Sequence, residues 1–285
     1  MLLPKTPRPL RPGDLRPIVL SAVASKLYTK AITLRLRRMW PPFQAGQLSA
    51  QPGAQTLDAS MGLAHLINLS NEWGLPLYAV KLDVAQAFDR TTHDAICKFL
   101  RTAGPSAEAR SLLHIIRNSR ISLQLGEKSW TQELHCGLVQ GSTYSAEIFA
   151  RVLDFFLAEA VRHWHENGYN GWMLRLGLLL YADDLILLAA TPAALQKKLE
   201  DTVSVLRLIG LTLSQKKCVV LAKKGADATH PPPQIYLAGQ ELPVQESIIF
   251  LGVTCGFALT DEERIRPLKA KAINSFWALK GVLCR

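Results

Sequence analysis

Two adjacent carboxylates lie at the centre of an otherwise apolar stretch, and this feature constrains the fold more than any other. Asp183 and Asp184 lie between the runs Leu178–Tyr181 and Leu185–Leu188. Each run has the length of a short buried strand. Because burial of an unpaired carboxylate is costly, the acids are expected at a tight turn, where they can face cations. The stretch therefore predicts a β-hairpin that presents Asp183 to a metal ion.

Two other interpretations of this stretch are open. A solvated hairpin turn would hold both aspartates simply because they tolerate turn dihedrals. A membrane span is the weaker alternative, since residues 174–190 are only just long enough to cross a bilayer and the two aspartates interrupt them at the centre. The rest of the chain decides between these interpretations.

The composition is that of a globular protein with a basic end. The 285 residues are 48% hydrophobic, which suits one large domain or two modest ones. The net charge is +10, and residues 1–40 carry nine Lys and Arg against one acid, Asp14. This asymmetry suits a polyanionic partner, although a helix face that charge merely keeps soluble gives the same pattern.

The cysteines and the first residues argue against several classes of protein. The five cysteines are scattered, without a Cys-x-x-Cys pair, which argues against a zinc ribbon and a disulfide framework and favours a reducing compartment. Pro4 and Lys5 follow Met1 almost at once, so no signal-peptide core is expected. We therefore expect an intracellular protein that does not bind a membrane.

The order of the expected elements places another carboxylate at a strand end. An extended arm over residues 1–12 precedes a helix over 21–39, and a second helix ends at Gly74. Leu77–Leu82 is an apolar run consistent with a buried strand, and it ends on Asp83. In the first helix, four apolar residues recur at helical spacing and are expected to form its packing face: Val23, Leu27, Ala31 and Leu34.

Beyond Asp83 the patterns alternate between helix and strand. Residues 121–125 and 130–134 predict a hairpin, and a glycine-bracketed loop over 137–142 feeds a long helix. After the central hairpin, Thr191 and Pro192 begin a helix that ends at Gly210. Short strands are expected over 218–221, 235–237 and 248–253, and residues 260–263 have the form of a capping box.

Asp83 and Asp183 together suggest a chemistry. Strand-end aspartates from separate parts of a chain could share a pair of Mg²⁺ ions, because Mg²⁺ prefers oxygen ligands and usually takes one or two carboxylates plus substrate phosphates. Two such ions stabilise both the attacking and the leaving oxygen of an in-line displacement. Nucleotidyl transfer is the reaction that this kind of site serves best.

The motifs resemble, in order, those of the reverse transcriptase domain of non-LTR (LINE-type) retrotransposons, from about Leu3 to about Gly281. The matching segments are Arg16-Pro17-Ile18, Gln44-Ala45-Gly46, Asp83 to Phe88-Asp89, Gln140-Gly141-Ser142, Tyr181-Ala182-Asp183-Asp184, Gly210-Leu211 to Lys217, and Phe250-Leu251-Gly252. The resemblance implies an α+β right-hand polymerase with an antiparallel palm sheet. It places the fingers at 1–75, the palm with some interleaved fingers elements at 76–255, and the start of a truncated thumb or connection at 256–285.

The resemblance also implies roles for individual residues. Asp83 and Asp183 would be the principal ligands of two Mg²⁺ ions, with Mn²⁺ as an alternative, and Asp184 would have a secondary role. Lys217 would protonate the leaving pyrophosphate, with Lys216 as the alternative if the motif is shifted by one residue. Nucleotide contacts are implied for Arg16 at the triphosphate, Phe88 as a steric gate against the 2′-hydroxyl, and Gln140 with Gly141 against the incoming nucleotide.

Departures from the family pattern qualify these expectations. Val139 and Ala146 stand where prolines are frequent, and Ser214 stands where asparagine is usual, so catalytic efficiency and loop geometry are in question. Asp89 is interpreted as a structural helix cap. We expect neither an endonuclease nor an RNase H region in this chain and only a short thumb, and therefore low processivity.

The function expected is RNA-directed DNA synthesis from a primer, with an RNA template, a DNA or RNA primer and dNTPs as partners, acting in the nucleus by analogy with the family. Alternatives are a catalytically decayed nucleic-acid-binding scaffold, an RNA-directed RNA polymerase, against which Phe88 argues, and a group II intron maturase. The sequence gives neither the template and target preference nor the oligomeric state.

Overall fold

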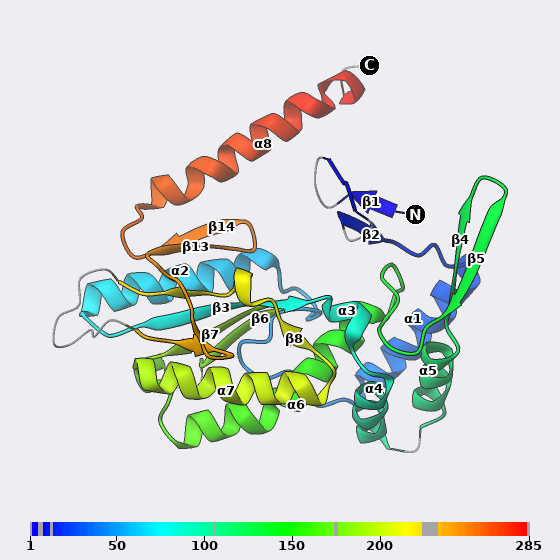
Figure 1. The fold of residues 1–285 in the computed structure, drawn as a ribbon, viewed down its shortest axis with the longest axis horizontal. Coiled ribbons are helices and arrows are strands. Elements are labelled where there is room, and N and C mark those ends of the chain that lie inside the picture. The colour runs from blue at the N-terminus through cyan, green and yellow to red at the C-terminus, as the bar shows by residue number, and fades with distance from the viewer. Residues whose placement is uncertain are drawn as a thin grey trace. The chain divides into compact units, whose positions relative to one another are not determined.

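The computed structural model describes residues 2–4, 8–11, 14–104, 106–173, 176–223 and 233–283, and Figure 1 shows its ribbon. The chain forms two compact units, each of which is described by itself. Unit 1 comprises residues 1–44, 84–158 and 203–212, and unit 2 comprises residues 45–83, 159–202 and 213–285. Both helices and antiparallel strands are present, so the expected α+β class is confirmed. The predicted limits of fingers, palm and thumb stay predictions.

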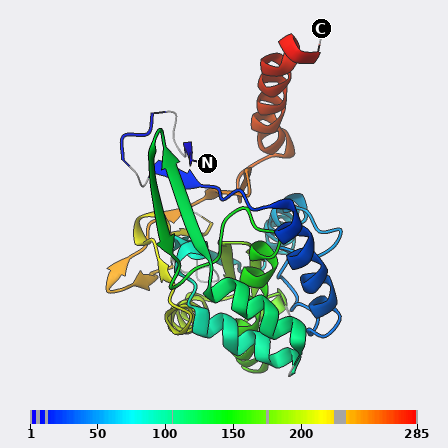
Figure 2. The same ribbon diagram turned by 90° about the vertical axis from the view of Figure 1, so that its right-hand side faces the viewer.

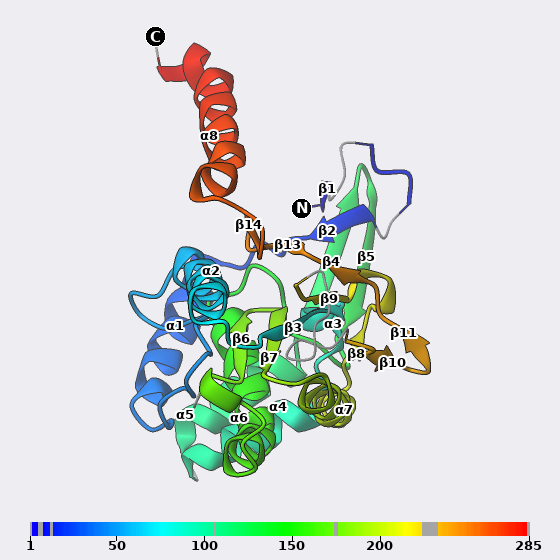
Figure 3. The same ribbon diagram turned by 90° about the vertical axis from the view of Figure 1, so that its left-hand side faces the viewer.

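Unit 2 is built on a six-stranded sheet with the order β12-β9-β3-β7-β6 and with β8 beside β3. The pairing is antiparallel along β9-β3-β7-β6 and parallel between β12 and β9. Helix α2 (Thr56–Trp73) lies on one face of this sheet and helix α7 (Pro192–Leu208) on the other (Figures 1 and 3). The strands are β3 (Tyr78–Ala85), β6 (Leu178–Tyr181), β7 (Asp184–Ala189), β8 (Thr212–Leu213), β9 (Val219–Leu221) and β12 (Val244–Gln245).

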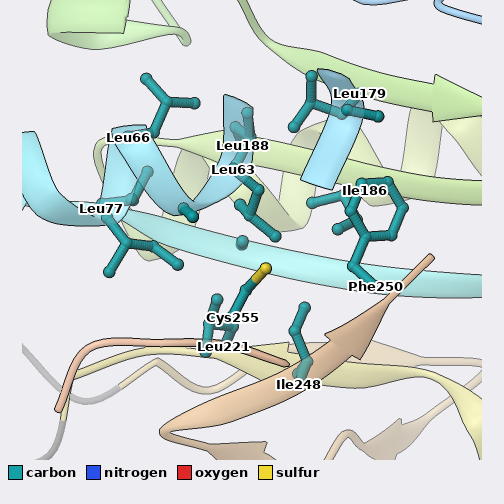
Figure 4. Packing of buried hydrophobic residues seen from close by; sticks show 14 of the residues in the cluster. Leu63, Leu66, Leu77, Leu179, Ile186, Leu188, Leu221, Ile248, Phe250 and Cys255 are labelled. Atoms are coloured by element: carbon teal, nitrogen blue, oxygen red, sulfur yellow. The ribbon is translucent and has the colours of Figure 1, made fainter. Parts of the chain in front are cut away.

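The core of unit 2 fills the space between α2, the sheet and a hairpin of β13 (Ser247–Phe250) and β14 (Val253–Gly256). Alternate residues of β7 point into this core, because side chains on a strand alternate between the two faces. Figure 4 shows the packing, with α2 and β13–β14 contributing from opposite sides. The residues labelled there are Leu63, Leu66, Leu77, Leu179, Ile186, Leu188, Leu221, Ile248, Phe250 and Cys255.

The β13–β14 hairpin corrects one expectation, since residues 248–253 were predicted to form a single strand. The chain reverses at Leu251 and Gly252, whose φ angles are +50° and +84°. Two consecutive residues with positive φ are typical of the tight turns that match the twist of a hairpin. The leucine at the first turn position hid this reversal, because asparagine, aspartate or glycine is usual there.

A short loop covers the outer edge of β6. The Leu180 amide donates to the Gly46 carbonyl at 2.8 Å, and the Leu48 amide donates to the Leu180 carbonyl at 2.9 Å. Gly46 has a φ of +93°, and a Cβ there would lie 2.0 Å from the Leu178 carbonyl oxygen. Only glycine fits this close approach, which satisfies the backbone groups of an edge strand.

Unit 1 contains helices, two separate hairpins and the first part of the long helix α6 (Ser145–Glu166). The β4–β5 hairpin (green) extends away from helices α4 and α5 (Figure 2). Residues 2–4 pair antiparallel with residues 15–17, so this part of the predicted extended arm belongs to a folded element, against expectation. The other elements are β1 (Leu2–Pro4), β2 (Leu15–Pro17), α1 (Val23–Arg37), α3 (Ala87–Arg90), α4 (His93–Leu100), α5 (Ala107–Arg117), β4 (Arg120–Leu125) and β5 (Lys128–Glu133).

The buried face of α1 is not the predicted one. The structure buries Thr29, Ile32, Thr33 and Leu36 and exposes the residues that were expected to pack, Val23, Leu27, Ala31 and Leu34. The two threonine hydroxyls donate to helix carbonyls one turn back, at Ser25 and Thr29. Because these hydrogen bonds satisfy the hydroxyls, two polar residues can occupy a packed face.

Helix α8 (Asp261–Leu283) begins with the predicted capping box. The Glu263 carboxylate accepts from the Thr260 amide at 2.8 Å, and the Glu263 amide donates to the Thr260 hydroxyl at 3.3 Å. In the part of the chain that the structure describes, no helix is both long and apolar enough to cross a membrane. The remaining elements are η2 (Arg101–Ala103), η3 (Gly171–Met173), η4 (Gln215–Lys217), β10 (Tyr236–Leu237) and β11 (Gln240–Glu241).

Candidate active site

Two carboxylates of unit 2 lie opposite each other at one end of β3 and β7, and a third lies in the adjoining turn. Asp83 on β3 is the register partner of Asp184, the first residue of β7. Like charges directly opposite each other across an antiparallel pair are destabilising. The carboxylates of Asp83 and Asp184 nevertheless lie together at a half-exposed strand end. This arrangement is expected where a protein binds cations.

The β6–β7 hairpin places the third carboxylate, as the sequence predicts. Tyr181 pairs with Asp184, so Ala182 and Asp183 form a two-residue turn. Ala182 has a φ of +55°, a conformation that is rare for a residue with a Cβ and that costs free energy. Asp183 is exposed at the tip of the hairpin, whereas Asp184 is half-buried beside Asp83.

A lysine lies on the first of these carboxylates. The Lys217 ammonium, carried by η4, is 3.3 Å from both Asp83 carboxylate oxygens. Backbone bonds fix the approach, since the Ser214 amide donates to the Asp83 carbonyl at 2.8 Å and the Lys217 amide donates to the Ser214 carbonyl at 2.9 Å. Of the two candidate lysines, the structure brings Lys217 to Asp83.

Lys81 is a member of this cluster that the sequence interpretation missed. Its ammonium donates to the Ile249 carbonyl at 2.6 Å and lies 4.0 Å from an Asp184 carboxylate oxygen. Its position two residues before Asp83 was the available signal, because residues i and i+2 of a strand share a face.

The pKa of Asp184 is raised from its ordinary value. Burial is the largest cause, and the negative charges of Asp183 and Asp83 raise it further, while the Lys81 ammonium lowers it. A carboxyl that resists ionisation beside two other acids is stabilised as the anion by any cation that joins the cluster. The cluster therefore has the electrostatics of a cation-binding site.

The residues present fit a hard divalent cation. Among the described residues, no three His, Cys, Asp or Glu side chains converge closely enough to hold a metal ion by themselves. Asp83 and Asp183 nevertheless supply oxygen donors, and Mg²⁺ is commonly held by one or two carboxylates, with water and substrate phosphates completing its coordination.

The expected nucleotide-contacting residues belong to unit 1. Phe88, on α3, is half-buried and stacks on Phe149 with the ring centroids 4.7 Å apart. The Phe88 carbonyl accepts from the Leu138 amide at 2.7 Å. The ring is thus held on one side by core packing, and its position as a gate stays a prediction.

Gln140 is held by a contact that corrects the interpretation of Asp89. Its side-chain amide donates to an Asp89 carboxylate oxygen at 3.0 Å. Asp89 lies inside the four-residue helix α3, whose N-cap is Gln86, so the predicted role of Asp89 as a helix cap is wrong. Asp89 instead orients Gln140, although 51 residues separate them in the chain.

Gly141 and Arg16 complete the predicted set. Gly141 has a φ of +101°, and a Cβ there would lie 2.6 Å from the Val19 carbonyl oxygen. Arg16 pairs with Leu3 in the β1–β2 hairpin, is exposed, and forms no ion pair with a described residue. The structure therefore joins Gln140 with Asp89 and Gly141 with Val19, and among the described residues no hydrogen bond or ion pair joins Arg16 to Phe88 or Gln140.

Comparison with known proteins decides the family. Residues 3–255 match the family profile described as reverse transcriptase (RNA-dependent DNA polymerase). The chain belongs to the reverse transcriptase family. The family match covers most of the segment from about Leu3 to about Gly281 on which the motif resemblance rested, and it includes all the predicted site residues.

Retrotransposon proteins are among the similar sequences of this reverse transcriptase chain. The Pol polyprotein of the type-2 retrotransposable element R2DM of Drosophila melanogaster is 28% identical over 232 residues, which cover 79% of this chain and 21% of the relative. The R2 Pol polyprotein of Nasonia vitripennis is 29% identical over 245 residues, or 81% of this chain and 23% of the relative. The predicted likeness to non-LTR elements is confirmed, and the chain spans about a fifth of the length of these relatives.

Solved structures support the predicted polymerase fold. Apo telomerase from Candida tropicalis superposes with a TM-score of 0.56 at 15% identity, over 85% of this chain and 41% of the telomerase chain. Apo telomerase from the same organism, truncated from its C-terminal domain, gives a TM-score of 0.53 at 15% identity. The match covers 82% of this chain and 43% of the truncated telomerase chain. The right-hand polymerase fold expected for a reverse transcriptase is therefore confirmed.

Proposed function

We propose that this chain is an RNA-directed DNA polymerase that extends a DNA or RNA primer with dNTPs on an RNA template. The observation that carries the proposal is the carboxylate cluster, in which Asp83 and Asp184 face each other across β3 and β7 and Asp183 occupies the adjoining turn. Membership of the reverse transcriptase family supports the same activity.

Asp83 and Asp183 would hold two Mg²⁺ ions, which Mn²⁺ could replace. When bound, such ions supply charge stabilisation for the attacking primer 3′-oxygen and the leaving pyrophosphate. Asp184 would add negative charge behind them. Lys81 limits the repulsion on Asp184, because it places a positive charge 4.0 Å from that carboxylate.

Lys217 would act as the general acid through its Nζ. Its ammonium is exposed and already lies at the Asp83 carboxylate, 3.3 Å from each oxygen. A donor held there can transfer a proton to the pyrophosphate oxygen as the phosphorus–oxygen bond breaks.

The remaining residues would bind and select the nucleotide. Arg16 carries a guanidinium fork that matches phosphate oxygens. Gln140, oriented by Asp89, would lie against the incoming nucleotide together with Gly141. Phe88, held by Phe149, would exclude the 2′-hydroxyl of a ribonucleotide.

Primer extension on an RNA template tests the proposal. We expect wild-type protein to incorporate dNTPs in Mg²⁺, and Asp183→Asn to lose at least about 10²-fold in rate. Asp94→Asn is the matched control, because Asp94 is an exposed aspartate paired only with Arg117. Equal loss in both variants, or undiminished extension by Asp183→Asn, would contradict the assignment.

The same assay tests nucleotide selection. Phe88→Val should raise rNTP incorporation relative to dNTP by roughly 10-fold, because overpacking in a filled space typically costs 1–3 kcal/mol. Phe156→Val is a control of equal size, since Phe156 packs against Phe155 in α6. An unchanged dNTP-to-rNTP ratio in Phe88→Val would remove Phe88 as the gate. RNA binding without any synthesis by the wild type would favour the scaffold alternative.

A further inference from the structure

A polar pocket of about 110 Å³ lies within unit 1, separate from the carboxylate cluster of unit 2. It is formed where the start of α1 meets the end of α5 and the loop that follows Gly141. Hydroxyl groups dominate its walls, and no acidic residue lines it. The residues that matter most are Ser21, Ser25, Lys26, Ser142 and Thr143.

Three donors of this pocket, on Ser21, Ser25 and Lys26, are not used by the protein itself. Lys26 forms no ion pair with any residue that the structure describes, and the hydroxyls of Ser21 and Ser25 have no hydrogen-bond partner within the same residues. Arg120 also lines the pocket, but it is paired with Glu133 at 2.6 Å. The pocket thus offers one uncompensated positive charge beside free hydroxyl donors, which is the chemistry that binds a phosphate oxyanion.

The walls are held in place by hydrogen bonds across the pocket. The hydroxyls of Thr29 and Thr143 lie 2.8 Å apart, and the Thr143 hydroxyl donates to the Lys26 carbonyl at 3.3 Å. The Ser119 hydroxyl donates to the Ile115 carbonyl at 2.7 Å, and the hydroxyls of Ser142 and Ser145 lie 2.5 Å apart. These bonds link α1 to the loop and fix the backbone that carries Lys26.

The size and position of the pocket indicate the source of the phosphate. Its volume of about 110 Å³ is enough to admit a phosphate group. It adjoins Gln140, since Val19 and Val139 line it and the Val19 amide donates to the Gln140 carbonyl at 2.9 Å. A strand that passes Gln140 could place its backbone there while its bases stay outside.

We propose that this pocket binds one backbone phosphate of the nucleic-acid strand, with the Lys26 ammonium as its main cation. The choice of a strand as ligand rests on the proposed polymerase function, whereas the phosphate chemistry rests on the pocket alone. Recognition of a backbone phosphate carries no base preference.

Equilibrium binding of a 5′-labelled oligouridine and a 5′-labelled oligoadenine RNA, in EDTA, tests this proposal without any catalysis. Lys26→Gln should weaken binding of both oligonucleotides by about tenfold and should reduce the slope of log affinity against log salt by about one. Lys30→Gln is the matched control, because Lys30 lies one turn further along α1, is exposed and does not line the pocket. Thermal melting should be unchanged in Lys26→Gln, since its ammonium has no partner to lose.

Each outcome decides between the proposals. Equal weakening by Lys26→Gln and Lys30→Gln would overturn the pocket and leave only a general basic surface. A Lys26→Gln effect on inorganic pyrophosphate or dATP binding, without an effect on either RNA, would overturn the strand as ligand. A specific Lys26→Gln effect on RNA in a protein that never extends a primer would support the pocket and overturn the polymerase function.

Discussion

Asp83 and Asp184 are register partners on β3 and β7, an arrangement that stability alone would disfavour. Lys217 and Lys81 each lie near one of these carboxylates. Both ion pairs are at least partly exposed, so their contribution to stability is small. At the scale of single residues, the repulsion between these carboxylates therefore lowers the stability of the protein without a cation and favours the binding of one.

The raised pKa of Asp184 predicts a pH-dependent gain in stability when the charge is removed. Because the folded pKa lies above the unfolded value, the stability linked to this group is fully present below the unfolded pKa and is lost as pH rises through the folded pKa. Asp184→Asn should therefore raise the melting temperature slightly at pH 7, measured in EDTA, and leave it unchanged near pH 3. A lower melting temperature at pH 7 would show that the carboxylate is stabilising as the anion.

The position of Lys217 predicts that Lys216 and Lys217 do not contribute equally to catalysis. Lys217→Ala should reduce the rate of nucleotide incorporation by ~10²-fold or more, as expected for loss of a general acid. Lys216→Ala is the natural control and should keep most of the rate, because only the Lys217 ammonium lies at Asp83. Single-turnover rates of the two variants, measured over pH 6–9, distinguish the two lysines. A larger loss of rate in Lys216→Ala would assign the general-acid role to Lys216 instead of Lys217.

At the scale of elements, the hairpin that carries Asp183 depends on its outer edge. Gly46 approaches the Leu178 carbonyl so closely that a Cβ would lie at 2.0 Å. Gly46→Ala should therefore lower the free energy of unfolding by roughly 1–3 kcal/mol, since the backbone must move or adopt a strained conformation.

Gly62 provides the matched control for this substitution. It lies inside α2, and nothing lies within 4 Å of a Cβ built there. Gly62→Ala should be neutral or stabilising by roughly 0.5–1 kcal/mol, because alanine favours helix. Urea unfolding of both variants gives the comparison, and equal free energies of unfolding would refute the close approach at Gly46.

Helix α7 is anchored to the same sheet by a buried amine. The Lys198 ammonium donates to the Leu188 carbonyl and to the Asn170 side-chain oxygen, both at 2.5 Å, and burial lowers the pKa of Lys198 to about 7. The unfolded chain then binds more protons than the folded one between about pH 7 and 10, so stability rises with pH across this window.

Lys198→Met tests this coupling. The free energy of unfolding of the variant should lack the contribution that rises with pH. In urea titrations, the free energy of unfolding of the wild type minus that of the variant should therefore increase between pH 7 and pH 9.5. Other groups that titrate in this range are common to both proteins and cancel in the difference. A difference that is the same at both pH values would show that Lys198 stays protonated in the fold.

Local patterns predicted much of the fold and of the carboxylate cluster. The runs that flank Asp183 and precede Asp83 are short, apolar and bounded by turn residues, so strand ends could be located from the sequence. The buried face of α1 could not be predicted, because Thr29 and Thr33 hide their hydroxyls in hydrogen bonds to helix carbonyls. Lys81 was missed because a lysine in a strand ordinarily indicates a solvent-facing position.

At the scale of the whole molecule, a net charge of +10 and an uncompensated Lys26 make the chain a candidate for a polyanionic partner. Such binding should weaken linearly in log affinity as log salt increases. Charge alone does not separate a polymerase from a nucleic-acid-binding scaffold, since both contact phosphates. Turnover at the carboxylates separates them.

The most direct measurement is therefore the single-turnover rate of dNTP incorporation on an RNA template in Mg²⁺, for wild type, Asp83→Asn, Asp183→Asn and the double variant. Residues that act as a unit are strongly non-additive. We predict that each single variant loses at least about 10²-fold and that the double variant is little worse than either. Undiminished incorporation in either single variant, or losses that multiply in the double variant, would contradict a common catalytic role for Asp83 and Asp183.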